Sequence, residues 1–216
     1  YDHLATDFPD DPTLWWQAQV GLALLDVAQQ RPREAAKRLR EAVTQRPQAL
    51  AEPGVWVELI RVQCLAEDLE GAVASATTAQ QRFPEERSIL LTLVEGLREA
   101  NQLARAQSVV LAALEQSPSD RRLYQTALDL YEDRGNVPDL AAWLEERARR
   151  QPRQPAWLEY LARLYPSQNQ TAQALATYDR LIALQPDRVS VLREAAQLAL
   201  GAADLARAEA WLTHAR

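Results

Sequence analysis

Residues 156–186 read AWLEYLARLYPSQNQTAQALATYDRLIALQP, and this stretch ends at a proline that recurs at regular intervals along the chain. Five prolines mark the intervals: Pro47, Pro84, Pro118, Pro152 and Pro186. Their spacings are 37, 34, 34 and 34 residues, and three identical intervals indicate an internal repeat. A period in this range is typical of a solenoid, in which each unit packs on its neighbours.

Small residues recur at one fixed place within this repeat. Twelve residues before the proline the chain has Ala35, Ala72, Ala106, Leu140 and Ala174. A small residue at a recurring position marks a close approach of two helices, because a larger side chain would separate them. Glycines are scarce, at 6, and β-branched residues are few, which favours helix over strand. The pattern therefore predicts an antiparallel helix pair repeated along the chain.

The stretch 156–186 resembles the tetratricopeptide repeat (TPR) family. The residues that carry the resemblance are Leu158, Leu161, Tyr165, Ala174, Tyr178 and Pro186. The resemblance implies an all-α, right-handed superhelical solenoid of antiparallel helix pairs, with about five complete repeats and partial ends. It also implies that the first helix of each pair lines the concave side and the second lies on the convex side.

We expect a single TPR array over residues 1–216. Its repeats are expected at 11–49, 53–86, 87–120, 121–154 and 155–188, with a partial repeat at 189–216. Because the sequence contains no methionine and its first ten residues look like the end of an upstream helix, we expect a fragment of a longer array.

The turn inside each repeat departs from the family pattern, which has a glycine there. The residues expected at these turns are Gly135, loosely Gly201, Glu67, Asn101 and either Asn169 or Gln170. Pro166 falls late in a first helix, so we expect that helix to stop short. Pro9 and Pro47 are 38 residues apart, which predicts an extra turn in the first helix of this repeat or at residues 30–32.

The repeat that ends at Pro152 leaves the local phase open. It has Leu140 and Arg147 where alanine is expected, with Ala141 and Ala148 one residue later. The architecture does not depend on which of the two phases holds.

Charge and hydropathy exclude several classes of protein. The net charge of −6 argues against a general nucleic-acid binder, which needs a basic face to displace counterions. No stretch approaches the roughly 20 apolar residues of a membrane span. The single cysteine, Cys64, excludes an internal disulfide, and the near absence of lysine beside abundant arginine suggests a bacterial source.

The residues that could carry chemistry are few and scattered. The two histidines, His3 and His214, lie near opposite ends and have no second ligand at metal-binding spacing. Cys64 has no histidine nearby in the sequence, and no phosphate-binding glycine loop or nucleophile elbow is present. We therefore expect no enzyme, no cofactor and no metal site.

The predicted concave face carries charges of both signs. The candidate partner-binding residues on it are Trp16, Arg61, Glu95, Arg98, Glu99, Asp129, Glu132, Asp133, Glu159 and Arg163. One interpretation is a groove for a basic or mixed-charge segment of a protein partner. The other is that Arg61–Glu95 and Asp129–Arg163 form ion pairs between repeats, which stabilise little when exposed.

Four tryptophans have their own expectations. Trp16 follows Trp15, which fits the core, so Trp16 is either a binding anchor or is rotated into the core by the extra turn. Trp157 is expected to pack against the previous repeat. Trp143 and Trp211 occupy matching places on second helices and are expected to edge the convex face or a contact with another chain.

These observations favour a non-catalytic scaffold that binds protein partners through its concave groove. The chain also loosely resembles the periplasmic repeat regions of outer-membrane proteins that export exopolysaccharides, of the Pel and cellulose type. A cytoplasmic assembly or regulatory adaptor is the alternative. Other possibilities are a homodimer and a helical repeat that contacts RNA or polysaccharide, although the acidic residues of the groove argue against RNA.

Overall fold

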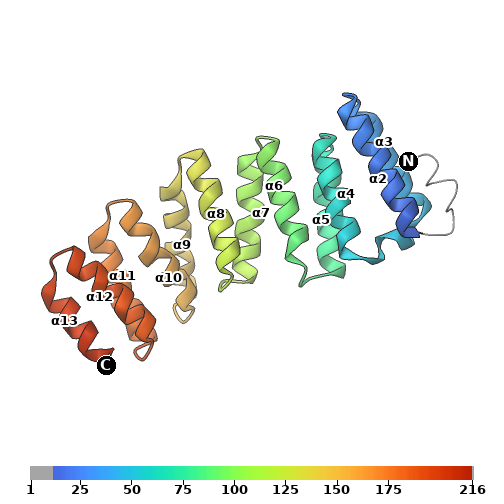
Figure 1. Cartoon of the computed structure of the whole chain (residues 1–216). Helices are drawn as coiled ribbons and strands as arrows, with labels where there is room; N and C mark the ends of the chain where they lie inside the picture. Colours follow the sequence, from blue (N-terminus) through green and yellow to red (C-terminus); the bar gives the residue numbers. More distant parts are fainter. Residues whose placement is uncertain (1–11, 216) are drawn as a thin grey trace. The chain divides into compact units, whose positions relative to one another are not determined.

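The computed structural model describes residues 12–215, and the predicted helix end within residues 1–10 lies outside this range. The described residues form α-helices, one short 3-10 helix and no strand (Figure 1). The helices of the first three pairs are α2 (Pro12–Ala28), α3 (Pro32–Gln45), α4 (Pro53–Leu65), α5 (Leu69–Arg82), α6 (Arg87–Glu99) and α7 (Leu103–Gln116). The helices of the last three pairs are α8 (Arg121–Arg134), α9 (Val137–Arg150), α10 (Pro155–Ser167), α11 (Thr171–Leu184), α12 (Val189–Gly201) and α13 (Leu205–His214).

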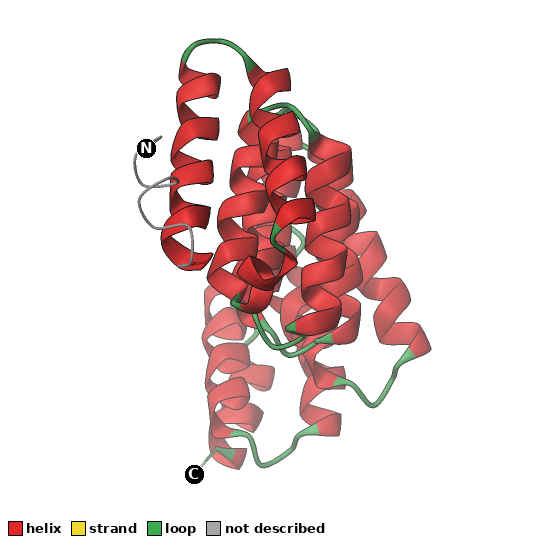
Figure 2. Cartoon of the chain, turned by 90° about the vertical axis from the view of Figure 1, so that its right-hand side faces the viewer, coloured by secondary structure: helices red, strands yellow, loops and turns green. Residues whose placement is uncertain are grey.

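Within each unit, helices pack on their partner in the pair and on a helix of the neighbouring pair. In the N-terminal half α4 contacts both α5 and α6, and in the C-terminal half α10 contacts both α9 and α11. Short loops join these helices, as Figure 2 shows. The prediction of an all-α chain of repeated helix pairs is therefore confirmed. The expected division into one array of six repeats stays a prediction.

The chain forms two compact units, with the boundary inside α7. Unit 1 ends at Val110 and unit 2 begins at Leu111. Each unit is described by itself below. Unit 1 also contains the 3-10 helix η1 (Pro47–Ala51), which accounts for the longer connection between its first two helix pairs.

The recurring alanines lie where two helices meet. Ala35, Ala72, Ala106 and Ala174 are all fully buried. In the fourth pair Leu140 takes this position and is also fully buried, and Ala148 rather than Arg147 continues the buried stripe of α9. Residues of both phases are therefore buried in α9, because Ala141 is buried beside Leu140, and neither phase holds throughout the helix.

The turn inside each pair places one residue in the left-handed backbone region. The residues with positive φ are Gln30, Glu67, Asn101, Gly135, Asn169 and Ala203. The predictions for Glu67, Asn101 and Gly135 are confirmed, and Asn169 rather than Gln170 takes the turn in its repeat. Gly201 was the wrong residue, because α12 continues through it and Ala203 adopts the positive φ.

The lengths of α2 and α10 test the expected extra turn in the first repeat and the expected shortening of a helix by Pro166. The extra turn of the first repeat lies in α2, which has 17 residues, whereas α4 and α10 have 13. The expectation that Pro166 shortens its helix is wrong, because α10 runs through it to Ser167. At this late position a proline removes one amide donor, and the N–H groups of Gln168 and Gln170 still donate to the Tyr165 carbonyl.

Gly96 allows α4 and α6 to approach closely. A Cβ atom built on Gly96 would lie 2.3 Å from the Cys64 Sγ and 2.6 Å from its Cβ. Cys64 is buried in α4, so it cannot move aside into solvent. The contact between these two successive helix pairs therefore requires glycine at the start of the last turn of α6, despite the cost of glycine in a helix.

Replacing Gly96 by alanine should destabilise the chain by about 1–3 kcal/mol, because the added methyl group overpacks this contact. Gly54→Ala is the matched control, since no atom lies within 4 Å of a Cβ at that helical position. The control should leave stability unchanged or raise it by up to about 1 kcal/mol. Urea unfolding followed by circular dichroism measures both, and equal midpoints for the two variants would contradict the contact.

Candidate functional site

In unit 1 the predicted residues of α4 and α6 lie on exposed surface. Arg61, Glu95, Arg98 and Glu99 are all exposed. The predicted ion pair between Arg61 and Glu95 does not form. Glu95 Oε2 instead lies 3.7 Å from an Arg98 guanidinium nitrogen one turn along the same helix. Within the part of the chain that the structure describes, Arg61 has no ion-pair partner.

Cys64 cannot act as a nucleophile at neutral pH. Burial of the side chain, and secondarily the negative charge of Glu99, raise the pKa of the Cys64 thiol to about 11. The thiol is therefore protonated, and a protonated thiol is a poor nucleophile. Its place in unit 1 is the packing contact with Gly96.

Trp16 was predicted as a possible binding anchor on the concave face, and that prediction is wrong. Its side chain is 1% exposed, so it cannot contact a partner. The alternative, that Trp16 lies in the core, is confirmed, and α2 is also the helix that carries the extra turn. Trp15 is also buried, and the Arg46 guanidinium lies over its ring at 4.7 Å.

In unit 2 three predicted acidic residues lie on α8. Glu132 and Asp133 are exposed, and Asp129 is half-buried. Asp129 accepts a hydrogen bond of 2.8 Å from the Gln125 side-chain amide one turn earlier. The predicted ion pair between Asp129 and Arg163 does not form, because Arg163 is engaged elsewhere.

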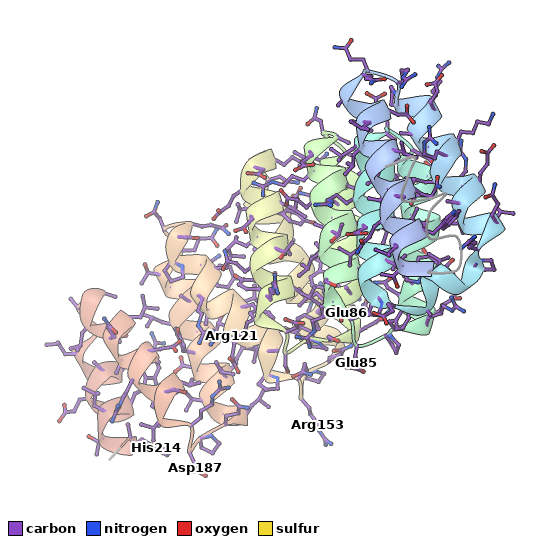
Figure 3. The ribbon with its side chains drawn as sticks, turned by 45° about the vertical axis from the view of Figure 1, so that its right-hand side comes forward. Glu85, Glu86, Arg121, Arg153, Asp187 and His214 are labelled. Carbon is purple, nitrogen blue, oxygen red and sulfur yellow. The ribbon has the colours of Figure 1, made fainter. Side chains whose placement is uncertain are left out.

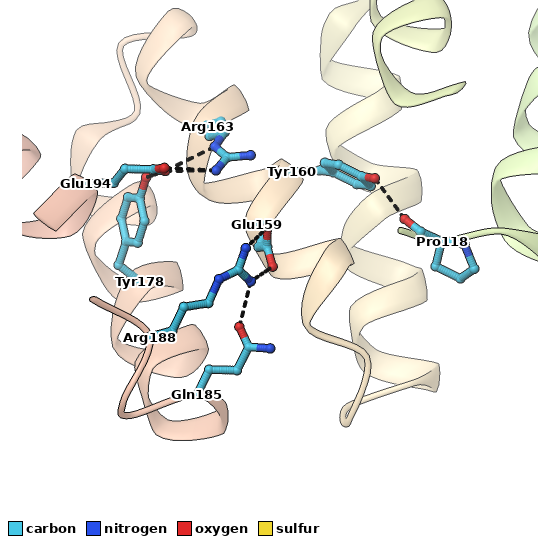
Figure 4. Close-up of polar contacts among 8 residues, drawn as sticks. All are labelled: Pro118, Glu159, Tyr160, Arg163, Tyr178, Gln185, Arg188 and Glu194. Atoms are coloured by element: carbon cyan, nitrogen blue, oxygen red, sulfur yellow. Dashed lines mark hydrogen bonds and ion pairs between the residues drawn. The ribbon is translucent and has the colours of Figure 1, made fainter. Parts of the chain in front are cut away.

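Arg163 of α10 is paired with Glu194 of α12. The guanidinium donates to both carboxylate oxygens over 3.0–3.1 Å, and the Tyr178 hydroxyl lies 3.5 Å from one of them (Figure 4). The pair joins two successive helix pairs and is partly shielded, with side-chain exposures of 29% and 42%. Arg163 is therefore a contact between repeats. Repeat spacing did not identify Glu194 as an ion-pair partner, because the equivalent position one repeat earlier holds Tyr160, which carries no charge at neutral pH.

Glu159 of α10 forms the second inter-repeat pair. Its carboxylate accepts from the guanidinium of Arg188, which lies in the loop before α12. The same guanidinium donates to the Gln185 side-chain oxygen at 2.8 Å (Figure 4). Glu159 and Arg163 thus form ion pairs between helix pairs, which agrees with the interpretation that the charges join repeats. The sequence did not indicate either of their partners.

Aromatic side chains join the helix pairs of unit 2. The rings of Tyr124 and Tyr160 stack with centroids 4.0 Å apart. The Tyr160 hydroxyl donates to the Pro118 carbonyl at 2.8 Å (Figure 4). Trp157 packs edge-on against Trp143 of the preceding pair at 5.6 Å, which confirms its prediction.

The expectation for the other two tryptophans is only partly met. Trp143 is half-buried, with the Arg147 guanidinium over its ring at 5.0 Å. Trp211 is buried against its neighbours, so the prediction that it edges an outer surface is wrong.

Two cavities in the described part of unit 2 could receive a ligand. The larger, of about 690 Å³, lies between α11 and α12 and is lined mainly by Tyr178, Gln197 and Leu198. The smaller, of about 270 Å³, lies at the starts of α8, α10 and α12 and includes Arg121, Tyr160 and Arg188. Arg121 is labelled in Figure 3.

Neither a metal-binding cluster nor a membrane-spanning helix occurs among the described residues. No group of three or more His, Cys, Asp or Glu side chains that could hold a metal ion occurs among residues 12–215. Over the same range, every helix is too short or too polar to cross a bilayer.

No protein-family model matches the sequence, and no curated protein is significantly similar to it. Solved structures of TPR proteins are similar to it. One is TTC0263 from Thermus thermophilus, at 22% identity and a TM-score of 0.41, covering 86% of this chain and 99% of that one. PilF from Pseudomonas aeruginosa matches at 17% identity and a TM-score of 0.38, covering 91% and 88%. YrrB, a TPR protein with an unusual peptide-binding site, matches at 10% identity and 0.42, covering 83% and 91%.

The fold assignment rests on the helix pairs themselves and on their 34-residue period. At these TM-scores the solved structures add no argument about partners.

The buried tyrosines of unit 2 predict loss of stability at alkaline pH. Burial is the main cause that raises the pKa of Tyr124, Tyr160 and Tyr178 to about 12. In the unfolded chain a tyrosine ionises near pH 10. Their contribution to stability is thus complete below about pH 10 and is lost as the pH rises from 10 to 12, by up to about 1.4 kcal/mol per pH unit for each tyrosine.

Absorbance of tyrosinate and circular dichroism, recorded together over pH 9–12.5, test this. The absorbance should rise steeply where the helical signal falls, and Tyr178→Phe should make the loss of stability less steep. Ionisation of all tyrosines near pH 10 in a chain that stays folded would contradict it.

Proposed function

Because the chain is built of TPR-type helix pairs, we propose that it is a non-catalytic scaffold that recruits protein partners. Stacked helix pairs offer an extended surface rather than an enclosed pocket. Partner segments would lie along the faces of the first helices that the core does not use. The acidic net charge of −6 favours a partner that is basic or of mixed charge over a nucleic acid.

The observation that carries this proposal is the exposed face of α4 and α6 in unit 1. Arg61 and Glu99 are exposed there and have no ion-pair partner among the described residues. One helical turn before Arg61 lies Val57, and two turns before Glu99 lies Leu91; both are only half-buried. Half-buried apolar side chains followed along the same helices by unused charges of both signs suit an extended segment that itself carries apolar groups and charges of both signs.

The charges of unit 2 differ from those of α4 and α6, and this difference supports placing the binding face on unit 1. Its α10 has charged residues at the equivalent positions, but Glu159 and Arg163 are bound by Arg188 and Glu194. Charges already engaged between repeats contribute little to recruiting a partner. We therefore assign the principal binding face to α4 and α6.

Selection of random twelve-residue peptides against the whole chain tests this function. The selected peptides should bind wild type, and Arg61→Glu combined with Leu91→Arg should weaken them at least ten-fold in fluorescence anisotropy. The matched control is Arg82→Glu, because Arg82 is exposed on the second helix α5 of the same unit. Equal binding by both variants, or failure to select any peptide, would contradict the proposal.

We also propose that the scaffold works in the periplasm, as a segment of a bacterial machine that exports exopolysaccharide. The support is the arginine-rich composition, with Lys37 as the only lysine, and the loose resemblance to repeat regions of such export proteins. Fractionation of the source cells should recover the protein with the periplasm or the outer membrane. Recovery with cytoplasmic markers would favour the alternative of a cytoplasmic adaptor.

A further inference from the structure

The smaller cavity of unit 2 has hydrogen-bond donors that nothing in the described chain uses. It lies where the loops before α8 and α12 meet the first turns of α10, and its volume is about 270 Å³. Arg121, at the start of α8, is exposed and has no hydrogen bond or ion pair with any residue in the range 12–215. The Ser119 hydroxyl is likewise unused within that range.

Two side-chain acceptors that line the same cavity are already engaged. The Glu159 carboxylate is bound by Arg188, and the Gln185 side-chain oxygen accepts from the same guanidinium (Figure 4). This second bond fixes the orientation of the Gln185 amide, so its NH₂ group is left as a further donor. The cavity therefore has a surplus of donors from three side chains.

The net charge of the residues that line the cavity also favours an anionic ligand. Its charged lining residues are Arg121, Arg188 and Glu159, which together carry a charge of +1. Asp120 lies next to Arg121 but is not among the residues that line the cavity; its Oδ1 accepts from the backbone amides of Arg122 and Leu123 and caps α8. One uncompensated guanidinium beside neutral donors matches a group with one negative charge and two acceptor oxygens.

We propose that this cavity binds a carboxylate side chain, an aspartate or glutamate, of a protein partner. The Arg121 guanidinium binds the two carboxylate oxygens, and Ser119 and the Gln185 amide supply further donors. The fixed Glu159 carboxylate in the same cavity disfavours a doubly charged phosphate, because a second negative charge would be repelled. The assignment of the carboxylate to a partner chain rests on the proposed scaffold function.

The larger cavity of unit 2 carries no comparable argument. Its charged lining residue, Glu194, is already paired with Arg163, and its apolar lining does not indicate which occupant would cover it.

Titration of the ¹⁵N-labelled chain with two capped tripeptides tests the site directly. Acetyl-Ala-Glu-Ala-amide should shift the backbone amides of residues 119–122 and the Arg121 Nε–H signal with saturable, millimolar affinity. Acetyl-Ala-Gln-Ala-amide has the same shape without the charge and should bind at least ten-fold more weakly. Equal shifts with both peptides would overturn the proposal.

Variants of two adjacent arginines separate the site from general electrostatics. Arg121→Gln should weaken the glutamate peptide at least ten-fold, and Arg121→Lys should retain part of the affinity because it keeps the charge but loses the two-pronged geometry. Arg122→Gln removes the same charge outside the cavity and should change the affinity less than two-fold. Full affinity in Arg121→Gln, or equal loss in both glutamine variants, would contradict the assignment.

Inorganic phosphate tests whether the cavity binds a phosphate group instead of a carboxylate side chain. It should compete with the glutamate peptide only weakly, and tighter binding of phosphate than of the peptide would overturn the assignment to a carboxylate. This titration is independent of the peptide selection on unit 1. Loss of the carboxylate site therefore leaves the scaffold function standing, and failure of the peptide selection leaves this site measurable.

Discussion

Burial of apolar surface between successive helix pairs is the interaction on which the structure depends. Trp157 shows it most directly, because its fully buried indole packs against Trp143 of the preceding pair. Complete burial of a large apolar side chain contributes roughly 1.5–3 kcal/mol, and an isolated pair of 13- and 14-residue helices would leave that surface in water. Each helix pair is therefore stable only when its neighbour covers it, and small residues such as Ala174 and Gly96 allow the close contact.

The sequence predicted those parts of the fold that repeat. The period of 34 residues, the buried alanines and most of the turns follow from one steric requirement that acts once in every helix pair, so the signal adds up along the chain. The parts that were predicted wrongly occur once. Trp16 is buried on α2, which carries the single extra turn, and Pro166 is tolerated because it stands in the last turn of α10.

The candidate site was predicted less well for a related reason. Repeat spacing correctly placed Arg61 and Glu95 on an exposed face, but the ion-pair partners of the other charges depend on individual side chains. Glu194 and Arg188 have no equivalent in the preceding repeats that would mark them as partners, so the pairs with Arg163 and Glu159 could be found only from the structure. Charges that form ion pairs between repeats hold the protein together, whereas charges that form none are available to bind a partner.

Circular dichroism of the isolated helix pair, residues 155–188, tests the dependence on neighbours most directly. This segment is the most regular repeat of the chain and holds α10 and α11. The account predicts that the segment alone is largely unfolded and shows no cooperative melting, whereas the same residues are helical in the whole chain. A cooperatively folded isolated pair would contradict it.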